Sequence, residues 1–177
     1  VSGEFIALLD HDDTLAPFAL YEVVKLLNTA PDLDFIYSDR DTMHQDGTRY
    51  LPLFKPQWSP DMLFNANYLT HVCVLRATLM QQIGGFKPQS DGAQDWMLFL
   101  EAATRTSRFE HIPQVLYHWR EHSRSTSSGM RAKPYAAKGQ VYAVQTYLDA
   151  LELPAHARFE LESVICIDWR LDPALKV

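Results

Sequence analysis

Four consecutive polar residues follow an apolar run near the start of the chain and could hold a metal ion. Residues 5–9 are apolar and lead directly into Asp10-His11-Asp12-Asp13. If the run is a strand of an open α/β sheet, this motif lies at its carboxyl end, where ligands bind in such sheets. Carboxylates there can bind Mg²⁺ or Mn²⁺, and the ion can bind phosphate oxygens. A simpler role is that Asp12 or Asp13 caps the helix beginning near Pro17, although three acids in four residues exceed what one cap needs.

Two enzyme classes use such a motif, and the motif alone fits both. Read as Asp10-x-Asp12-x-Thr14-Leu15, it matches the nucleophile motif of haloacid-dehalogenase-like phosphatases, where the first Asp attacks phosphorus and the second is the acid/base. Read as Asp10-x-Asp12, it resembles the DXD motif of GT-A glycosyltransferases. The phosphatase also needs a later Lys and a later acidic pair after a strand. Lys55 and Lys87 lie in Pro-rich loops, and no acidic pair follows a later apolar run.

Downstream motifs favour the second class. Residues 68–72 lead through Arg76 to Gly84-Gly85-Phe86, residues 92–96 precede a helix, and residues 115–122 are followed by Ser125-Thr126. This ordered set resembles family-two glycosyltransferases of the GT-A fold, especially bacterial rhamnosyltransferase-like members that build surface polysaccharides. The resemblance covers about residues 3–127. It implies an inverting enzyme that moves a sugar from a nucleotide-diphosphate donor to a glycan or lipid-linked glycan acceptor.

The resemblance also implies a catalytic base. In this family, an acid at the start of the helix after Gly-Gly-Phe accepts the proton of the acceptor hydroxyl as that oxygen attacks the anomeric carbon. Asp95 is the matching residue. Many relatives have Glu-Asp there, whereas this chain has Gln94-Asp95, so the neighbouring acid is absent. Asp95 could also serve as a helix cap.

The remaining site residues are expectations from the same resemblance. Asp10, Asp12 and His122 are expected to bind Mn²⁺ or Mg²⁺, which acts as a Lewis acid toward the departing diphosphate. Asp13, Arg120 and His118 are expected on the donor diphosphate, where a guanidinium can neutralise phosphate oxygens. Trp96, His71 and Gly85 are expected on the acceptor side, with Trp96 offering a ring to a sugar or, equally, packing in the core.

Composition limits the function classes further. The chain has 177 residues, is 47% hydrophobic, and carries a formal net charge of −6. An acidic chain without clustered Lys and Arg is not expected to bind nucleic acid. Two distant cysteines in apolar runs, Cys73 and Cys166, are expected to be buried free thiols, which suits the cytoplasm. No run is long enough to span a bilayer. We therefore expect a cytoplasmic protein, at the inner face of the membrane only through other parts or partners.

The pattern of elements predicts the frame that positions these residues. Residues 5–9 are expected to form a strand buried on both faces, and residues 17–28 a helix with a stripe at Leu20, Val23, Val24 and Leu27. A strand at residues 35–38 should end at Asp39, and the stretch with Asp39 and Asp41 should be a solvated hairpin turning at Asp46-Gly47. Strands at 72–75 and 109–118, the latter an edge or crossover strand, should alternate with helices at 78–83 and 95–104.

Strands alternating with helices indicate an α/β fold, here a GT-A mixed sheet flanked by helices. We expect residues 1–130 to be its metal and acceptor side, without the nucleotide-binding part. Residues 131–177 should add a helix and a strand pair that lead toward a second domain. Such a piece is expected to be inactive alone and to associate with itself through exposed sheet edges. A phosphatase and a non-catalytic, glycan-binding or scaffolding domain remain the alternatives.

Overall fold

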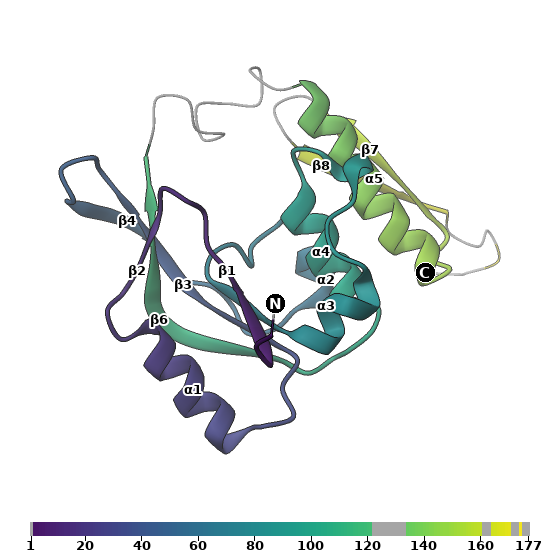
Figure 1. The fold of residues 1–177 in the computed structure, drawn as a ribbon. Helices are drawn as coiled ribbons and strands as arrows, with labels where there is room; N and C mark the ends of the chain where they lie inside the picture. Colours follow the sequence, from purple (N-terminus) through teal and green to yellow (C-terminus); the bar gives the residue numbers. More distant parts are fainter. Residues whose placement is uncertain (1, 122–133, 161–163, 171–173, 175–177) are drawn as a thin grey trace.

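The computed structural model describes residues 2–121, 134–160, 164–170 and 174. They form a mixed β-sheet with helices on both faces, followed by a long helix and a two-stranded sheet (Figure 1). The α/β class and the helix-flanked mixed sheet predicted from the sequence are therefore confirmed.

The described residues contain fourteen helices and strands. The strands of the main sheet are β1 (Phe5–Leu8), β2 (Thr14–Leu15), β3 (Phe35–Met43), β4 (Arg49–Leu53), β5 (Cys73–Arg76) and β6 (Phe109–Arg120). Its helices are α1 (Ala19–Thr29), α2 (Pro60–Leu63), α3 (Ala77–Ile83), the 3₁₀ turn η1 (Pro88–Ser90) and α4 (Gln94–Ala103). The C-terminal elements are α5 (Pro134–Ala150), β7 (Ala155–Glu160) and β8 (Val164–Trp169).

The main sheet has the order β1-β5-β3-β6-β2, with β4 added to the far end of β3. Strands β3 and β6 run parallel, and every other pair is antiparallel. Strand β6 is the longest, and it pairs with β3 on one side and β2 on the other. It is therefore an internal strand that the chain reaches by a crossover, so the predicted crossover is confirmed and the alternative of an edge strand was wrong. Its register places His118 beside Asp41 of β3 and Thr14 of β2.

Strand β1 differs from its prediction as well. Among the described residues it pairs only with β5, and Ala7 within it is exposed. Leu9, which follows the strand, is 51% exposed. The prediction of a strand buried on both faces was wrong for this part of the chain, because an apolar run does not specify how many neighbours a strand has.

Strand β3 continues well beyond the predicted end at Asp39. It runs to Met43, and both Asp39 and Asp41 are buried within it, so the solvated hairpin predicted for them was wrong. The turn itself lies where the sequence placed it. Gly47 adopts a positive φ of 88°, and the backbone N–H of Thr48 donates to Oδ1 of Asp46 at 2.8 Å.

Each face of the sheet has its own apolar core. On one face, α1 packs Ala19 and Val23 against Ile36, Val74 and Leu116. The predicted stripe on this helix was wrong in part, because Leu20 and Val24 are 60% and 55% exposed. On the other face, α2, α3 and α4 cover the sheet with side chains that include Leu63, Leu79, Phe99 and Leu100.

Helix α5 and the β7–β8 pair extend this second core. Val144 and Leu148 of α5 are fully buried in the same cluster as α4, together with Ala157 and Ile165 of the small sheet. The predicted domain boundary at residues 130 and 131 lies outside the described residues. Both cysteines are free, as predicted, but only Cys73 is buried, because Cys166 lies on the partly exposed small sheet.

Candidate active site at the carboxyl end of strand β1

The acidic motif occupies the turn that joins β1 to β2. Its last residue, Asp13, is buried, and both of its oxygens accept hydrogen bonds from β6. The hydroxyl of Tyr117 donates to Oδ2 at 2.5 Å, and the backbone N–H of Arg120 donates to Oδ1 at 2.7 Å. The Tyr117 hydroxyl also accepts from the backbone N–H of Asp10 at 3.2 Å. Strand β6 thus holds the motif at both ends.

The other two acids of the motif are more exposed. Asp10 carries an exposed side chain, and the pKa of its carboxyl is raised by partial burial and by the charges of Asp13 and Asp12. Oδ1 of Asp12 lies 3.7 Å from Nδ1 of His11. Asp12 is not a member of the group that Asp10 forms with Asp13 and His71. The backbone carbonyl of Asp12 accepts from Nε of Arg120 at 2.8 Å, so Arg120 braces the turn with its side chain as well.

Among the described residues, Asp10, Asp13 and His71 form a group that could hold a metal ion. One ligand atom from each lies within 4.8 Å of the other two. Octahedral ligands at about 2.1 Å from a metal are roughly 3–4 Å apart, so small side-chain shifts would complete such a shell. The donor set fits a divalent cation, because two carboxylates supply charge and an imidazole suits Mn²⁺. Of the predicted ligands, Asp10 belongs to this group, Asp12 lies beside it, and His122 lies outside the described residues.

His71 enters this group from the segment before β5. Its ring stacks on Tyr117 with centroids 4.8 Å apart, and its Nε2 lies 3.8 Å from Oδ2 of Asp10. Burial, together with the nearby charges of Lys55 and Arg40, lowers the pKa of His71 to about 4. The imidazole is therefore neutral near pH 7, which is the form that ligates a metal.

Lys55 fixes the segment that carries His71. This side chain is buried, and its Nζ donates to the backbone carbonyls of Leu69 and His71, each at 2.8 Å. Its backbone N–H donates to Oδ1 of Asp39, which also lies 2.8 Å from Nε2 of His111. Burial lowers the pKa of the Lys55 ammonium to about 8. The sequence offered no signal for this role, because Lys55 is an isolated lysine in a Pro-rich loop.

Asp95 lies in the first turn of α4. Ala93 is the N-cap residue, and no side chain makes a capping hydrogen bond. The Asp95 carboxylate therefore does not cap this helix. Among the described residues the carboxylate has no hydrogen-bond or ion-pair partner. Burial and the charge of Asp10 raise the pKa of Asp95 to about 6. This is a partly buried, unpaired carboxylate within electrostatic reach of the acidic motif, with a pKa suited to a general base.

The structure separates His118 from this group. Adjacent residues of a strand point to opposite faces, and Tyr117 faces the acidic motif. His118 faces away, with its Nδ1 2.6 Å from Oδ1 of Asp41 and its Nε2 3.3 Å from Nη1 of Arg49. The buried Asp41–His118 pair and the exposed Arg49 together tie β6 to β3 and β4. The placement does not support the predicted contact between His118 and a donor diphosphate.

Of the three predicted acceptor residues, His71 belongs to the metal group described above, while the other two lie in the core and in a turn. Trp96 is 5% exposed within the apolar core, and its Nε1 donates to the carbonyl of Leu63 at 2.7 Å. It is therefore a core residue and presents no ring face to a sugar. Gly84 and Gly85 both adopt positive φ, near 84° and 80°, and form the turn that ends α3.

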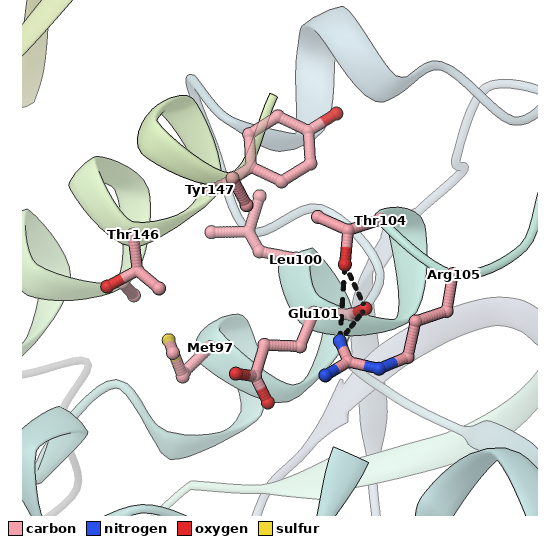
Figure 2. Close-up of a pocket in the computed structure, with 9 residues that line it drawn as sticks. Met97, Leu100, Glu101, Thr104, Arg105, Thr146 and Tyr147 are labelled. Carbon is pink, nitrogen blue, oxygen red and sulfur yellow. Dashed lines mark hydrogen bonds between the residues drawn. The ribbon is translucent and has the colours of Figure 1, made fainter. Parts of the chain in front are cut away.

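A cavity lies away from this group, between α4 and α5 (Figure 2). Its volume is about 140 Å³, and its lining includes Met97, Leu100, Glu101, Arg105 and Tyr147. None of the predicted site residues lines it. The figure shows that Nη1 of Arg105 donates to the backbone carbonyl of Glu101 and to the hydroxyl of Thr104, at the end of α4. Because these contacts join neighbouring turns of a helix, we assign the cavity to helix packing.

Two searches, one for membrane-spanning helices within the part of the chain that the structure describes and one for matching family models, gave no match. Among the described helices, none combines the length and apolar character needed to cross a bilayer. No family model matches the chain.

Three curated relatives resemble it. It is 40% identical over 148 residues to the uncharacterized protein y4gI of Sinorhizobium fredii, covering 82% of this chain and 16% of that protein. It is 38% identical over 146 residues to the O-antigen biosynthesis protein RfbC of Myxococcus xanthus, covering 82% and 12%. It is 28% identical over 142 residues to the uncharacterized glycosyltransferase YwdF of Bacillus subtilis, covering 75% and 51%. The chain thus spans less than a fifth of the first two relatives and about half of the third.

Solved structures show the same fold. S. aureus TarS residues 1–349 in complex with UDP-GlcNAc superposes with a TM-score of 0.64 at 13% identity, over 85% of this chain and 43% of that one. The same protein in complex with UDP gives a TM-score of 0.58 at 12% identity, over 84% and 41%. The fold is therefore GT-A-like. Of the relatives, one is named as an O-antigen biosynthesis protein and one as a glycosyltransferase.

Proposed function

We propose that the protein containing this chain transfers a sugar from a nucleotide-diphosphate donor to a glycan or lipid-linked glycan, with inversion at the anomeric carbon. The observation that carries the proposal is the unpaired carboxylate of Asp95, held within electrostatic reach of Asp10. A GT-A-like sheet with an acid and histidine group on one side and a raised-pKa carboxylate beside it suits such a reaction. Synthesis of a bacterial surface polysaccharide in the cytoplasm, at the inner face of the membrane, fits the name of the M. xanthus relative.

Asp95 is the proposed catalytic base. With a pKa near 6, its carboxylate is mostly ionised at pH 7 and is still basic enough to accept a proton from a sugar hydroxyl. That transfer makes the acceptor oxygen nucleophilic while it attacks the anomeric carbon on the face opposite the leaving diphosphate. The absence of another partner for the carboxylate, among the described residues, keeps it available for the acceptor.

Asp10, Asp13 and His71 are the proposed holders of Mn²⁺ or Mg²⁺, with Asp12 beside them. When bound, the ion would supply Lewis-acid stabilisation of the leaving diphosphate. Hydrogen bonds from the Tyr117 hydroxyl and the backbone N–H of Arg120 fix the orientation of the Asp13 carboxylate before an ion binds. Burial keeps His71 neutral, so no proton has to leave before it binds a cation.

The test uses the full-length protein and follows release of the nucleoside diphosphate from UDP-GlcNAc, which is bound in the S. aureus TarS complex, and from a nucleotide-rhamnose donor. We expect Asp95→Asn to lower kcat by about 10³-fold or more while the Kd for UDP changes little, because a general base and its positioning act only in the reaction step. The matched control is Asp32→Asn, an exposed Asp after α1. Near-normal turnover of Asp95→Asn would overturn the assignment of the base.

The alternatives predict different results. A phosphatase would release phosphate from p-nitrophenyl phosphate in a way that depends on Asp10. A non-catalytic domain would bind a glycan but release no UDP from any donor, with or without Mn²⁺. Either result would contradict the proposed transfer.

A further inference from the structure

Arg40 is a charged side chain near the candidate site. Neither the metal group nor the proposed base gives it a role. It lies in the middle of β3, in register with Tyr117 of β6, whose hydroxyl binds Asp13. Its guanidinium lies over the ring of Trp119, with the central carbon 4.9 Å from the ring centroid. Strand alternation places Arg40, Tyr117 and Trp119 on one face, and the Asp41–His118 pair on the other.

The guanidinium of Arg40 has five N–H donors. Among the described residues, it forms neither a hydrogen bond nor an ion pair. The contrast with other arginines is clear. Arg76 bonds to Glu4, Asp34 and two backbone carbonyls, and Arg120 bonds to the carbonyl of Asp12. Arg40 is partly buried, and desolvation lowers the pKa of its guanidinium. A partly desolvated cation without hydrogen bonds is unfavourable unless a ligand completes it.

The neighbourhood of Arg40 belongs to the candidate site. The charge of Asp13 acts on Arg40, and the charge of Arg40 in turn acts on His71 and Lys55. Asp41 and Tyr117 complete the titratable groups that act on it. Arg40 therefore brings positive charge to the edge of an acidic group. The ring of Trp119 holds the guanidinium in place through a cation–π contact.

We infer that Arg40, held over the ring of Trp119, is a binding residue for an oxyanion of the substrate. A planar guanidinium with free donors matches the two oxygens of a phosphate or a carboxylate. Two parts of the substrate pair could supply such a group, namely the diphosphate of the donor and the carboxylate of an acidic acceptor sugar. This inference deepens the proposed function and rests on it for the identity of the substrate, but the anion site can be tested without any transfer.

The test titrates two probes into the full-length protein by calorimetry, inorganic pyrophosphate with MgCl₂ and, separately, a glucuronate-containing disaccharide. We expect at least one probe to bind, and Arg40→Gln to weaken that binding by about tenfold or more, as expected when charge-assisted hydrogen bonds are lost. If the variant loses affinity for pyrophosphate, the oxyanion that Arg40 binds is the donor diphosphate. If it loses affinity for the uronate, the oxyanion is the carboxylate of the acceptor. Arg40→Lys should give an intermediate affinity, because it keeps the charge and loses the planar fork.

Two controls make the result decisive. Arg158→Gln removes the same charge from an exposed arginine on β7, and its affinities should equal those of the unmodified protein. The melting temperature of Arg40→Gln should not fall, because the side chain it replaces makes no hydrogen bond among the described residues. A melting temperature that falls with unchanged affinities would show a structural role and overturn the inference, as would an unmodified protein that binds neither probe. Arg40-dependent binding without sugar transfer would leave this inference standing and contradict the proposed function instead.

Discussion

The hydroxyl of Tyr117 donates a 2.5 Å hydrogen bond to Oδ2 of Asp13, across 104 residues of sequence. Through it, the middle of the sheet orients a carboxylate in the turn after β1. The same hydroxyl accepts from the backbone of Asp10, and the same ring stacks on His71. All three members of the candidate metal group thus contact one tyrosine, and four predictions follow from this arrangement and from the surroundings of the site.

Tyr117→Phe should weaken the binding of Mn²⁺ and reduce stability together. The variant keeps the ring under His71 but leaves Oδ2 of Asp13 without its donor, which should lower the free energy of unfolding by about 1–3 kcal/mol. Urea unfolding and calorimetric titration of Mn²⁺ measure the two effects. Tyr142→Phe on α5, at an exposed position, should change neither. An unchanged Mn²⁺ affinity in Tyr117→Phe would show that Asp13 does not bind the ion.

Asp95→Asn should make the protein more stable above pH 6. The pKa of Asp95 is raised from 3.8 to about 6 in the folded protein, so folding favours its protonated form. The favourable contribution is therefore complete below pH 3.8 and is lost as the pH rises to about 6. Removing the carboxyl should gain about 1–2 kcal/mol at pH 8, after a discount for its partial exposure, and nothing at pH 3.5.

Chemical unfolding of both proteins between pH 3.5 and 8 measures this difference. In the same range, kcat/KM of the unmodified protein should rise with pH and level off above about 6, since the base must be ionised. A stability difference that is constant with pH would mean that the Asp95 carboxyl is not perturbed by folding.

Lys55→Met should raise the pKa of His71. The pKa of His71 is lowered to about 4 chiefly by burial and next by the charge of Lys55, so removing that charge should move it upward. An NMR titration of the imidazole carbon resonances measures the shift. Lys25→Met removes a lysine from the exposed surface of α1 and should leave the titration of His71 unchanged. No movement in Lys55→Met would show that the charge of Lys55 does not lower this pKa.

Trp96→Phe should affect stability and not acceptor binding. The indole N–H binds the carbonyl of Leu63 inside the core, so the smaller ring should lower the free energy of unfolding by about 1–3 kcal/mol. The KM for the acceptor should stay within about twofold, because the loss of a buried packing contact does not act on a distant ligand. Trp169→Phe, at a 46% exposed position, is the matched control for stability. A large rise in acceptor KM would restore the predicted platform role.

Several features of the fold could be read from local sequence, because neighbouring residues alone decide them. Asp46-Gly47 predicted the β3–β4 turn, since Gly47 must adopt a positive φ. Gly84-Gly85 predicted the end of α3 for the same reason. The order of strands and helices indicated an α/β sheet, and the motif order indicated the GT-A-like fold.

Errors occurred where burial depends on a partner far along the chain. Asp39 and Asp41 look like hairpin residues, yet His111 and His118 satisfy their carboxylates in the interior, so β3 can continue through them. Strand β6 looked like an edge, because its pairing with β2 is only two residues long and carries no pattern of its own. Trp96 was equally suited to a core or a platform, and only the carbonyl of Leu63 decided between them.

The sequence by itself determined that acids lie at the end of a strand and that Asp95 begins a helix after a glycine turn. The tertiary structure decided which of these groups meet. It joined Asp10 and Asp13 to His71, turned His118 to the other face, and left Arg40 stacked on Trp119 without a partner among the described residues. The physical reason is that the direction of each side chain is set by strand register, and register is fixed by hydrogen bonds between segments many residues apart.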